Sequence, residues 1–270
     1  MDGHTRVAIV TGANGAIGRA IATGMAERNF AVVLVCRDRK RGEQALEYVR
    51  ERSGRPAKQE AARLEIADVS RSAEVLALAQ RWQGPLHVLI NNAALAPRQR
   101  QETPEGIETQ FATNVLGYLW MTQTFAPVLQ ACRPARVVNV ASYWAGDLDL
   151  DDLEFRRRPY DNNTAYRQSK QADRMLTVAL ARRLANTGIT VNACHPGDAN
   201  SRLSNDLGFG GSDTPEGAAE TPIWLASSPA LSGTSGCYFA HEKQVTCAFS
   251  HDSVAIDELY DLCYQRLPLL

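Results

Sequence analysis

Short apolar runs alternate with amphipathic stretches along the chain. The runs Val7–Val10 and Ala31–Cys36 are apolar and rich in β-branched residues, which is typical of fully buried strands. Between residues 17 and 25 an apolar side chain recurs every four positions, which predicts a helix. The charged stretch Arg39–Arg52 predicts a second helix, at the surface. The amino-terminal part of the chain therefore predicts strand, helix, strand and helix in succession.

The same alternation continues to the carboxyl-terminal region. Further strands are predicted at Leu64–Ile66, Leu86–Asn91, Arg136–Val140, Thr190–Cys194 and Cys237–Phe239, and further helices at Ala73–Trp82 and Thr164–Asn186. Two Thr-Pro-Glu sequences, at Thr103 and Thr214, each combine a hydroxyl cap, a proline and a carboxylate, so each predicts a helix start. The pattern predicts a single α/β domain over residues 1–270, a Rossmann-type doubly wound parallel sheet with helices on both faces.

Composition agrees with one globular domain and excludes several partners. Of the 270 residues, 44% are hydrophobic and 22% are charged, and the formal net charge is −1, so we expect no nucleic-acid or membrane partner. The first strand starts at Val7, which leaves too little room for a signal peptide, and we expect a cytoplasmic protein. The five histidines and six cysteines form no ligand cluster, so no metal is expected.

A turn rich in small residues joins the first strand to the first helix. Small side chains there let backbone amides approach a pyrophosphate at the helix amino terminus. The spacing differs from the common G-x-G-x-x-G, and a tight turn without a ligand is the alternative. The predicted cofactor contacts in this turn are Gly12, Asn14, Ala16, Ile17 and Gly18.

The end of the second strand bears on the choice of dinucleotide. Sites for NAD(H) place an acid here for the ribose 2′-hydroxyl, whereas Cys36 and Arg37 offer no acid and one guanidinium. This pair favours NADP(H), with NAD(H) as the alternative. Asp38 comes directly after them, and its carboxylate weakens the case for NADP(H). The alternative for Arg37 is an arginine in a solvated loop without a ligand.

A tyrosine and a lysine lie one helical turn apart on the long predicted helix. Tyr166 and Lys170 share a helix face, and a phenol needs a nearby cation to exchange protons at neutral pH. Ser142 comes after the Arg136–Val140 strand and is predicted to reach the same sheet edge as the glycine-rich turn. These three residues are candidates for proton transfer and for orienting a substrate oxygen, although each alone is more often structural.

Taken together, these motifs resemble the short-chain dehydrogenase/reductase family over essentially the whole chain. The matching features are the glycine-rich turn, Asn91-Asn92-Ala93-Ala94, Asn114, Ser142, Tyr166-x-x-x-Lys170 and Pro196-Gly197. The resemblance implies that Tyr166 is the acid/base, that Ser142 polarises the substrate oxygen, and that Lys170 lowers the pKa of Tyr166 and holds the nicotinamide ribose. It also implies that Asn114 maintains a proton relay. The cofactor contacts that it implies are Asp68, Val69, Asn92, Ala93, Tyr166, Lys170, Pro196, Gly197 and Ser201.

Within the family the chain is most similar to the retinol dehydrogenase-like branch and its soluble bacterial relatives. It departs from that branch at Asp198, Asn200 and Ser201, which puts the contacts of this loop in doubt. Two segments are expected to determine the substrate. Residues 143–163 form a substrate loop, either an apolar lid or a solvated surface loop, and residues 198–213 form a flap that orders when ligand binds.

The sequence therefore predicts an NADP(H)-dependent oxidoreductase that interconverts a carbonyl and a primary or secondary alcohol. The expected substrate is a moderately hydrophobic small molecule, and the expected assembly is a homodimer or homotetramer. A non-catalytic dinucleotide sensor or scaffold is the alternative from another class. A nucleotide-sugar dehydratase or epimerase is disfavoured, because the region after Pro196 is too short for a separate substrate domain.

Overall fold

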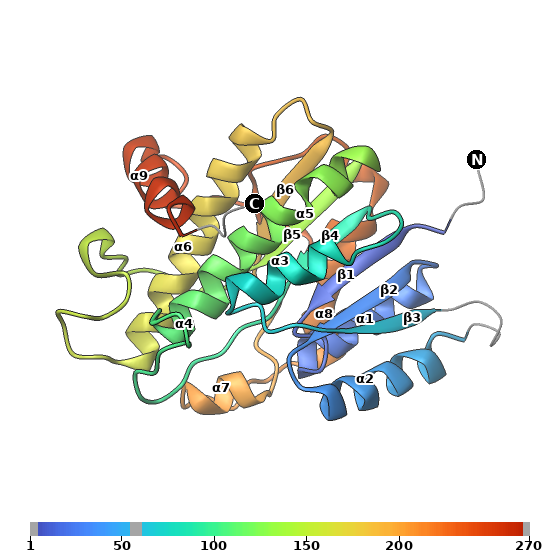
Figure 1. Ribbon diagram of the computed structural model, residues 1–270, viewed down its shortest axis with the longest axis horizontal. Helices are drawn as coiled ribbons and strands as arrows, with labels where there is room; N and C mark the ends of the chain where they lie inside the picture. The colour runs from blue at the N-terminus through green and yellow to red at the C-terminus, as the bar shows by residue number, and fades with distance from the viewer. Residues whose placement is uncertain (1–4, 55–60, 267–270) are drawn as a thin grey trace.

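A computed structural model of the chain describes residues 5–54 and 61–266, and these form one eight-stranded sheet with helices on both sides (Figure 1). The strands lie in the order β3-β2-β1-β4-β5-β6-β7-β8. Their bounds are β1 Val7–Thr11, β2 Ala31–Cys36, β3 Ala62–Ile66, β4 Val88–Asn91, β5 Ala135–Val140, β6 Ile189–Cys194, β7 Tyr238–Ala240 and β8 Lys243–Val245. All neighbouring pairs are parallel except β7 with β8. The doubly wound sheet is thus confirmed, with an antiparallel edge strand that the sequence did not predict.

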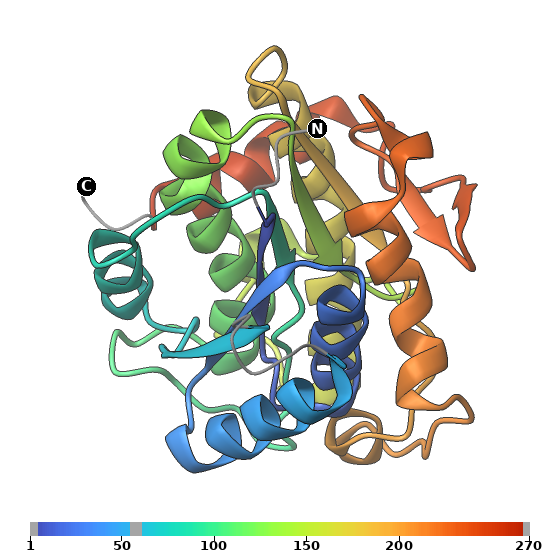
Figure 2. The same ribbon diagram turned by 90° about the vertical axis from the view of Figure 1, so that its right-hand side faces the viewer.

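Two groups of helices cover the two faces of the sheet. One face carries α3 Ser72–Gln80, α5 Gly117–Ala131 and α6 Asn162–Arg183, and α9 Ser253–Tyr264 packs on α6. The other face carries α1 Ala16–Glu27, α2 Arg39–Arg52 and α8 Pro215–Ser227 (Figure 2). The remaining short elements are α4 Thr109–Phe111, the π-helical turn Ala112–Leu116, α7 Arg202–Asp206 and the 3₁₀ turns Leu150–Asp152 and Pro229–Leu231.

The strands β1 and β2 are almost entirely apolar because both of their faces are buried. In β1, Ile9 packs on the α5 side, whereas Ala8 and Val10 pack on the α1 side. The same alternation holds in β2, where Val33 and Leu34 belong to opposite cores. The continuous apolar runs in the sequence therefore result from a sheet that is covered by helices on both sides.

The order of the strands reverses next to β1, which lies between β2 and β4. The segments that leave the carboxyl ends of these strands diverge at such a point and open a crevice between them. Six consecutive parallel strands, β1 to β6, end at this edge of the sheet. Any site built from the residues directly after these strands lies at this edge.

One predicted helix start is wrong. Thr103 does not begin a helix: the Gly106 N–H donates to the Thr103 carbonyl oxygen at 2.8 Å, and Gly106 has a φ of 74°, so the segment closes as a turn. The helical segment begins at Thr109, where the Glu108 carboxylate accepts hydrogen bonds from the Gln110 and Phe111 N–H groups. The second Thr-Pro-Glu start, at Thr214, is confirmed as the cap of α8.

Candidate active site

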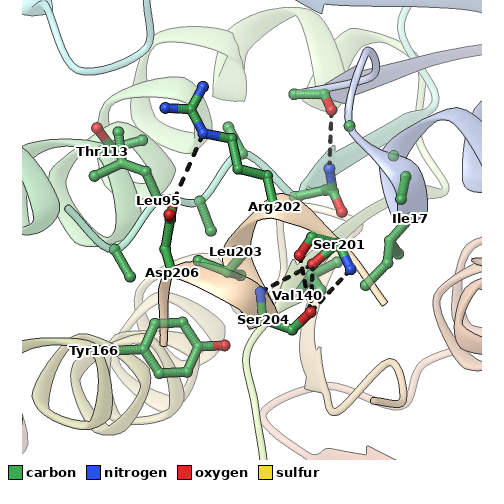
Figure 3. Close-up of a pocket in the computed structure, with 18 of the residues that line it drawn as sticks. Ile17, Leu95, Thr113, Val140, Tyr166, Ser201, Arg202, Leu203, Ser204 and Asp206 are labelled. Atoms are coloured by element: carbon green, nitrogen blue, oxygen red, sulfur yellow. Dashed lines mark hydrogen bonds and ion pairs between the residues drawn. The ribbon is translucent and has the colours of Figure 1, made fainter. Parts of the chain in front are cut away.

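A cleft of about 570 Å³ lies at the carboxyl edge of the sheet. It is lined by the segments after β1, β2, β3, β4, β5 and β6 and by residues of α6 and α7. Figure 3 shows Tyr166 of α6 on one side of the cleft and α7, with Ser201 to Asp206, across from it. Every site residue that the sequence predicts lines this cleft, except Asn114. The fold therefore brings together residues that lie far apart in the sequence.

The glycine-rich turn at the start of α1 is packed so closely that side chains are excluded. Gly12 has a φ of 63°, and a Cβ there would lie 2.7 Å from the Ala93 Cα. A Cβ on Gly18 would lie 2.4 Å from the Gly12 carbonyl oxygen. Asn92 ties the turn to β4, because its Nδ2 donates to the Thr11 carbonyl oxygen at 2.9 Å. The turn and the strand next to it thus form one rigid floor of the cleft.

The amino terminus of α1 is left open towards the cleft. Its N-cap is Gly15, and no side chain among the described residues caps it, whereas Asp38 caps α2 and Asp161 caps α6. Uncapped first-turn N–H groups and the positive end of the helix dipole suit an anionic group. The small residues around them leave room for a phosphate to reach these N–H groups, so this end of the cleft fits a dinucleotide pyrophosphate.

Two arginines line the cleft beyond β2. Arg37 and Arg41 are both exposed, and neither has an ion-pair partner among the residues that the structure describes. The carboxylate of Asp38 lies between them in sequence but is used locally, since its Oδ1 accepts the Arg41 N–H at 2.8 Å as the cap of α2. The charge at this end of the cleft is therefore positive, and the neighbouring acid has a structural task.

Asp68 and Val69 lie directly after β3 and line the same end of the cleft. The Asp68 Oδ1 accepts hydrogen bonds from the Ser70 N–H at 3.0 Å and from its hydroxyl at 2.7 Å. The Asp68 backbone N–H donates to Glu74 at 2.8 Å. These bonds fix the loop after β3, where the resemblance places the adenine.

Ser142 and Tyr166 meet at the opposite end of the cleft. Both are buried, at 7% exposed each, and Ser142 lies close enough to lower the pKa of the phenol. Burial is the larger effect and raises the pKa of Tyr166 well above its usual value. Arg174 holds the backbone here by donating to the Ser142 carbonyl oxygen and to the Tyr238 hydroxyl. Burial and the Ser142 hydroxyl thus shift the pKa of the phenol in opposite directions, and the lowering by Lys170 that the resemblance implies stays a prediction.

Lys170 lies beneath Tyr166 with its ammonium group fully enclosed. Its Nζ is 5.8 Å from the centroid of the Tyr166 ring and donates to the Val140 carbonyl oxygen at 3.0 Å. It also donates to the Asp173 Oδ2 at 2.8 Å, and both side chains are at most 1% exposed. Burial is the largest single effect and lowers the pKa of Lys170, but Asp173 and Tyr118 together outweigh it, and the net shift is upward. The cation beside Tyr166 is therefore already neutralised by an acid.

Asn114 lies behind the cleft, in the π-helical turn, and is fully buried. Its Nδ2 donates to the Leu95 carbonyl oxygen at 3.0 Å and to the Ser169 hydroxyl at 3.1 Å, and its Oδ1 accepts the Leu95 N–H at 3.0 Å. The side chain fixes the segment after β4 against α6. Single π-helical turns are frequent at functional sites, and the relay that the resemblance implies for Asn114 stays a prediction.

The 143–163 loop was expected to be either an apolar lid or a solvated surface loop, and its side chains fit neither description fully. Leu153 and Phe155 are buried, and Leu148 and Leu150 pack against the main core, so these side chains do not form a lid over the cleft. Trp144 does reach the site, with its ring centroid 6.1 Å from that of Tyr166. The acidic residues are not all solvated either, because the buried Asp152 accepts the N–H groups of residues 156–158.

The 198–213 segment contains the short helix α7, lines the cleft and packs against Trp144. Ser201 caps α7: its hydroxyl accepts the Ser204 N–H at 3.1 Å, and its own N–H donates to the Ser204 hydroxyl at 2.9 Å (Figure 3). Phe209 lies 5.7 Å from Trp144, ring centroid to centroid. Leu203 and Leu207 complete an apolar group around Tyr166. This group gives the end of the cleft next to Tyr166 its hydrophobic wall.

Sequence reasoning missed two buried ionisable residues next to the site. Asp173 stands three positions after Lys170, and this i,i+3 spacing on a predicted helix was the available signal. His195 directly precedes Pro196, lines the cleft and is 7% exposed. Burial lowers the pKa of His195 to about 4, so its imidazole is neutral at neutral pH. No sequence pattern shows that these two side chains are buried.

The fold and the cleft define the class of protein, an α/β protein of the Rossmann type with a dinucleotide-sized cleft at the switch point of its sheet. Residues 6–208 match the short chain dehydrogenase family. The chain belongs to this family of NAD(P)(H)-dependent oxidoreductases.

Individual relatives agree with the branch that the motifs indicate. The chain is 34% identical to retinol dehydrogenase 13 of Homo sapiens over 258 residues, which cover 88% of this chain and 77% of that one. It is 35% identical to a probable oxidoreductase of Streptomyces antibioticus over 267 residues, 90% of this chain and 87% of that one. A solved structure of an uncharacterized protein from Mycobacterium paratuberculosis superimposes with a TM-score of 0.79, at 27% identity, covering 98% of this chain and 95% of that one. In the part of the chain that the structure describes, no helix is long and apolar enough to cross a membrane.

Proposed function

We propose that the protein reduces the carbonyl group of a moderately hydrophobic small molecule with NADPH, and oxidises the corresponding alcohol in the reverse direction. The observation that carries this proposal is the meeting of Ser142, Tyr166 and Lys170 in one cleft with the glycine-rich turn. When bound, the dinucleotide supplies or takes up the hydride at its nicotinamide. The protein's own residues then have to orient the substrate and move a proton.

Tyr166 is the residue that gives the proton to the substrate oxygen. Because burial raises the pKa of the Tyr166 phenol, its hydroxyl carries a proton throughout the neutral range. Ser142, beside it, has a hydroxyl that can donate to the same oxygen and polarise the carbonyl. The Val140 carbonyl oxygen and Asp173 hold Lys170 in place below the phenol. The protonated phenol and the Ser142 hydroxyl can both donate to a carbonyl oxygen, as reduction requires.

NADP(H) is the preferred cofactor in this proposal. Arg37 and Arg41 line the cleft beyond β2, where a ribose 2′-phosphate would accept charge-assisted hydrogen bonds. The Asp38 Oδ1 is engaged as the cap of α2 and Asp38 does not line the cleft, which weakens the argument for NAD(H). Asn92, Ala93, Pro196, Gly197 and Ser201 line the stretch between the two ends and are proposed to contact the cofactor.

The apolar group around Tyr166 supports a hydrophobic substrate. Trp144 comes from the 143–163 loop, and Leu203, Leu207 and Phe209 come from the 198–213 segment. The 198–213 segment lines the cleft itself and Trp144 packs against the same apolar group, so we propose that both segments determine which carbonyl compound binds. The sensor or scaffold alternative predicts dinucleotide binding without turnover of any carbonyl compound.

The decisive experiment is Tyr166→Phe, which removes one hydroxyl and keeps the ring. Turnover of a carbonyl substrate should fall by a factor of about 10² to 10⁴, since general acid catalysis contributes an effect of this size. NADPH affinity, measured by fluorescence titration, should stay within about threefold, because the Tyr166 ring and all the other predicted cofactor contacts are kept. Tyr260→Phe, another buried tyrosine but on α9, is the matched control and should keep full activity. Full turnover by Tyr166→Phe would refute the proposed role.

A further inference from the structure

A buried carboxylate lies on the far side of Lys170 from the cleft. Asp173 is one helical turn after Lys170 on α6, and its Oδ2 accepts a hydrogen bond from the Lys170 Nζ at 2.8 Å. The exposed fractions of the two side chains are 1% for Lys170 and 0% for Asp173. The Oδ1 of Asp173 has no hydrogen-bond partner among the described residues. The pair is thus a fully enclosed ion pair and not a surface contact.

Among the residues that the structure describes, the one cation that forms an ion pair with Asp173 is Lys170. The Tyr118 ring of α5 lies 5.0 Å from the Lys170 Nζ, and its hydroxyl donates to the Val140 carbonyl oxygen at 3.1 Å. The remaining titratable groups whose charges act on Lys170, Asp173 or Tyr166 are Tyr143, Cys194, Asp198 and Cys263. Arg174, next to Asp173 in sequence, is engaged with the Ser142 carbonyl oxygen and with Tyr238.

An ammonium group buried in this way needs a counter-charge to remain ionised. Burial favours the neutral amine, and an isolated buried lysine loses its proton far below its usual pKa. Of the three hydrogen-bond donors of Lys170, one is used by Asp173 and one by the Val140 carbonyl oxygen. The Tyr118 phenol also interacts with this ammonium group. Asp173 therefore affects both the charge and the direction of Lys170.

We propose that Asp173 is a positioning residue of the reaction, whose carboxylate keeps Lys170 charged and fixes its ammonium group between α6 and the end of β5. The proposal rests on the proposed function and goes beyond it, because Asp173 does not line the cleft. The negative charge of Asp173 also offsets the positive charge of Lys170 next to Tyr166. The protonated phenol is thereby favoured over the phenolate, which matches a site that donates a proton to a carbonyl oxygen.

Asp173→Asn tests this role, because the amide keeps the shape and one acceptor but removes the charge. Without the carboxylate, the buried ammonium loses its proton more easily and the phenol is closer to an uncompensated cation, so both pKa values fall. Carbonyl reduction needs both groups protonated. The alkaline limb of kcat/KM for reduction should therefore move at least about one unit lower in pH, a loss of about tenfold on that limb. At pH 6.5 the activity should stay within about threefold of wild type.

A matched control separates this effect from ordinary loss of an ion pair. Asp257→Asn removes an acid that pairs with Arg183 of α6 at 3.0 Å, but this pair is exposed and far from the cleft. Its pH profile should equal that of the wild type. If Asp173→Asn lowers the melting temperature but leaves the alkaline limb where it is in the wild type, Asp173 has a structural role only and the proposal is overturned.

A measurement on the unaltered protein covers the case in which Asp173→Asn does not fold. The chain has four lysines, Lys40, Lys58, Lys170 and Lys243, so their side-chain nitrogen signals can be resolved by NMR, with Lys170→Arg to assign the signal. Lys170 should remain charged up to about pH 10, near the usual lysine pKa. Loss of its charge below about pH 9 would contradict the proposal. This readout needs no turnover, so it still decides the role of Asp173 if no carbonyl substrate is reduced and the proposed function fails.

Discussion

The two ends of the cleft are built in different ways. At the end formed by β1, α1 and β4, the walls are backbone: Gly12 and Gly18 touch neighbouring main-chain atoms, and Asn92 is bonded to the Thr11 carbonyl oxygen. At the end around Tyr166, the walls are the side chains Leu203, Leu207 and Phe209, which come from the 198–213 segment. The first end has a single geometry that any side chain would disturb, whereas the second can be changed one side chain at a time.

This difference separates what the family shares from what one member can vary. The pyrophosphate is common to NAD(H) and NADP(H), so its site can be made of backbone that fits closely. A substrate differs between members, and side chains on loops change its site without disturbing the sheet. Changes at the two ends should therefore alter different measured quantities, cofactor affinity at one end and KM for the carbonyl substrate at the other.

The largest effect is expected at the backbone end, from Gly12→Ala. The added Cβ would meet the Ala93 Cα at 2.7 Å, and an alanine is strained at a φ of 63°. NADPH affinity should fall by at least about 100-fold, or about 2.7 kcal/mol, measured by fluorescence titration. Gly84→Ala is the control, because Gly84 also has a positive φ, 89°, but a Cβ there would meet nothing within 4 Å. Unchanged affinity in Gly12→Ala would mean that the turn is not a cofactor cradle.

A smaller and selective effect is expected from Arg37→Ala. Hydrogen bonds to a charged group contribute about 1.5–3 kcal/mol, so NADPH should bind about 10- to 100-fold more weakly while NADH binds as before. Arg39→Ala removes a neighbouring exposed arginine that pairs with Glu43 and lies outside the cleft, and it should change neither affinity. Equal losses for the two dinucleotides would show that Arg37 does not recognise the 2′-phosphate.

The smallest effect is expected at the side-chain end, from Phe209→Ala. Phe209 is 38% exposed and contributes mainly its contact with Trp144, and an aromatic pair is worth about 0.5–1.5 kcal/mol. KM for a hydrophobic carbonyl should rise about two- to tenfold, with NADPH affinity unchanged. Val254→Ala, at an exposed apolar residue of α9, should leave both quantities unaltered. If NADPH affinity falls with KM, the two ends are not independent and the comparison fails.

Two identical tetrapeptides show the limit of local sequence signals. Thr-Pro-Glu-Gly occurs at residues 103–106, where it closes a turn, and at residues 214–217, where it begins α8. After the second copy come Ala218 and Ala219, which are buried, so the packing of the helix stabilises it. In the first copy the chain turns back, and the buried Glu108 caps the helical segment instead. Tertiary contacts therefore prevent Thr103 from capping a helix.

Some residues of the candidate site could be predicted from the sequence, and others could not. The residues at the ends of β1, β2, β4 and β5 could be predicted from the strand pattern, because the loops that leave parallel strands all start at one edge of the sheet. The pairing of Lys170 with Asp173 could not. Its spacing was visible, but such a pair is usually solvated, and only the surroundings show that no water reaches it.

The sequence by itself determined the order of strands and helices, the double burial of the sheet and the set of residues at its carboxyl edge. These depend on periodicity and on small residues at fixed places, which local steric rules govern. Only the tertiary structure decided that Asp38 caps α2, that the leucines of the 143–163 loop join the core, and that Asp173 neutralises Lys170. Those outcomes depend on burial and on partners distant in sequence, and the energy of a charge or an apolar side chain is set by its surroundings.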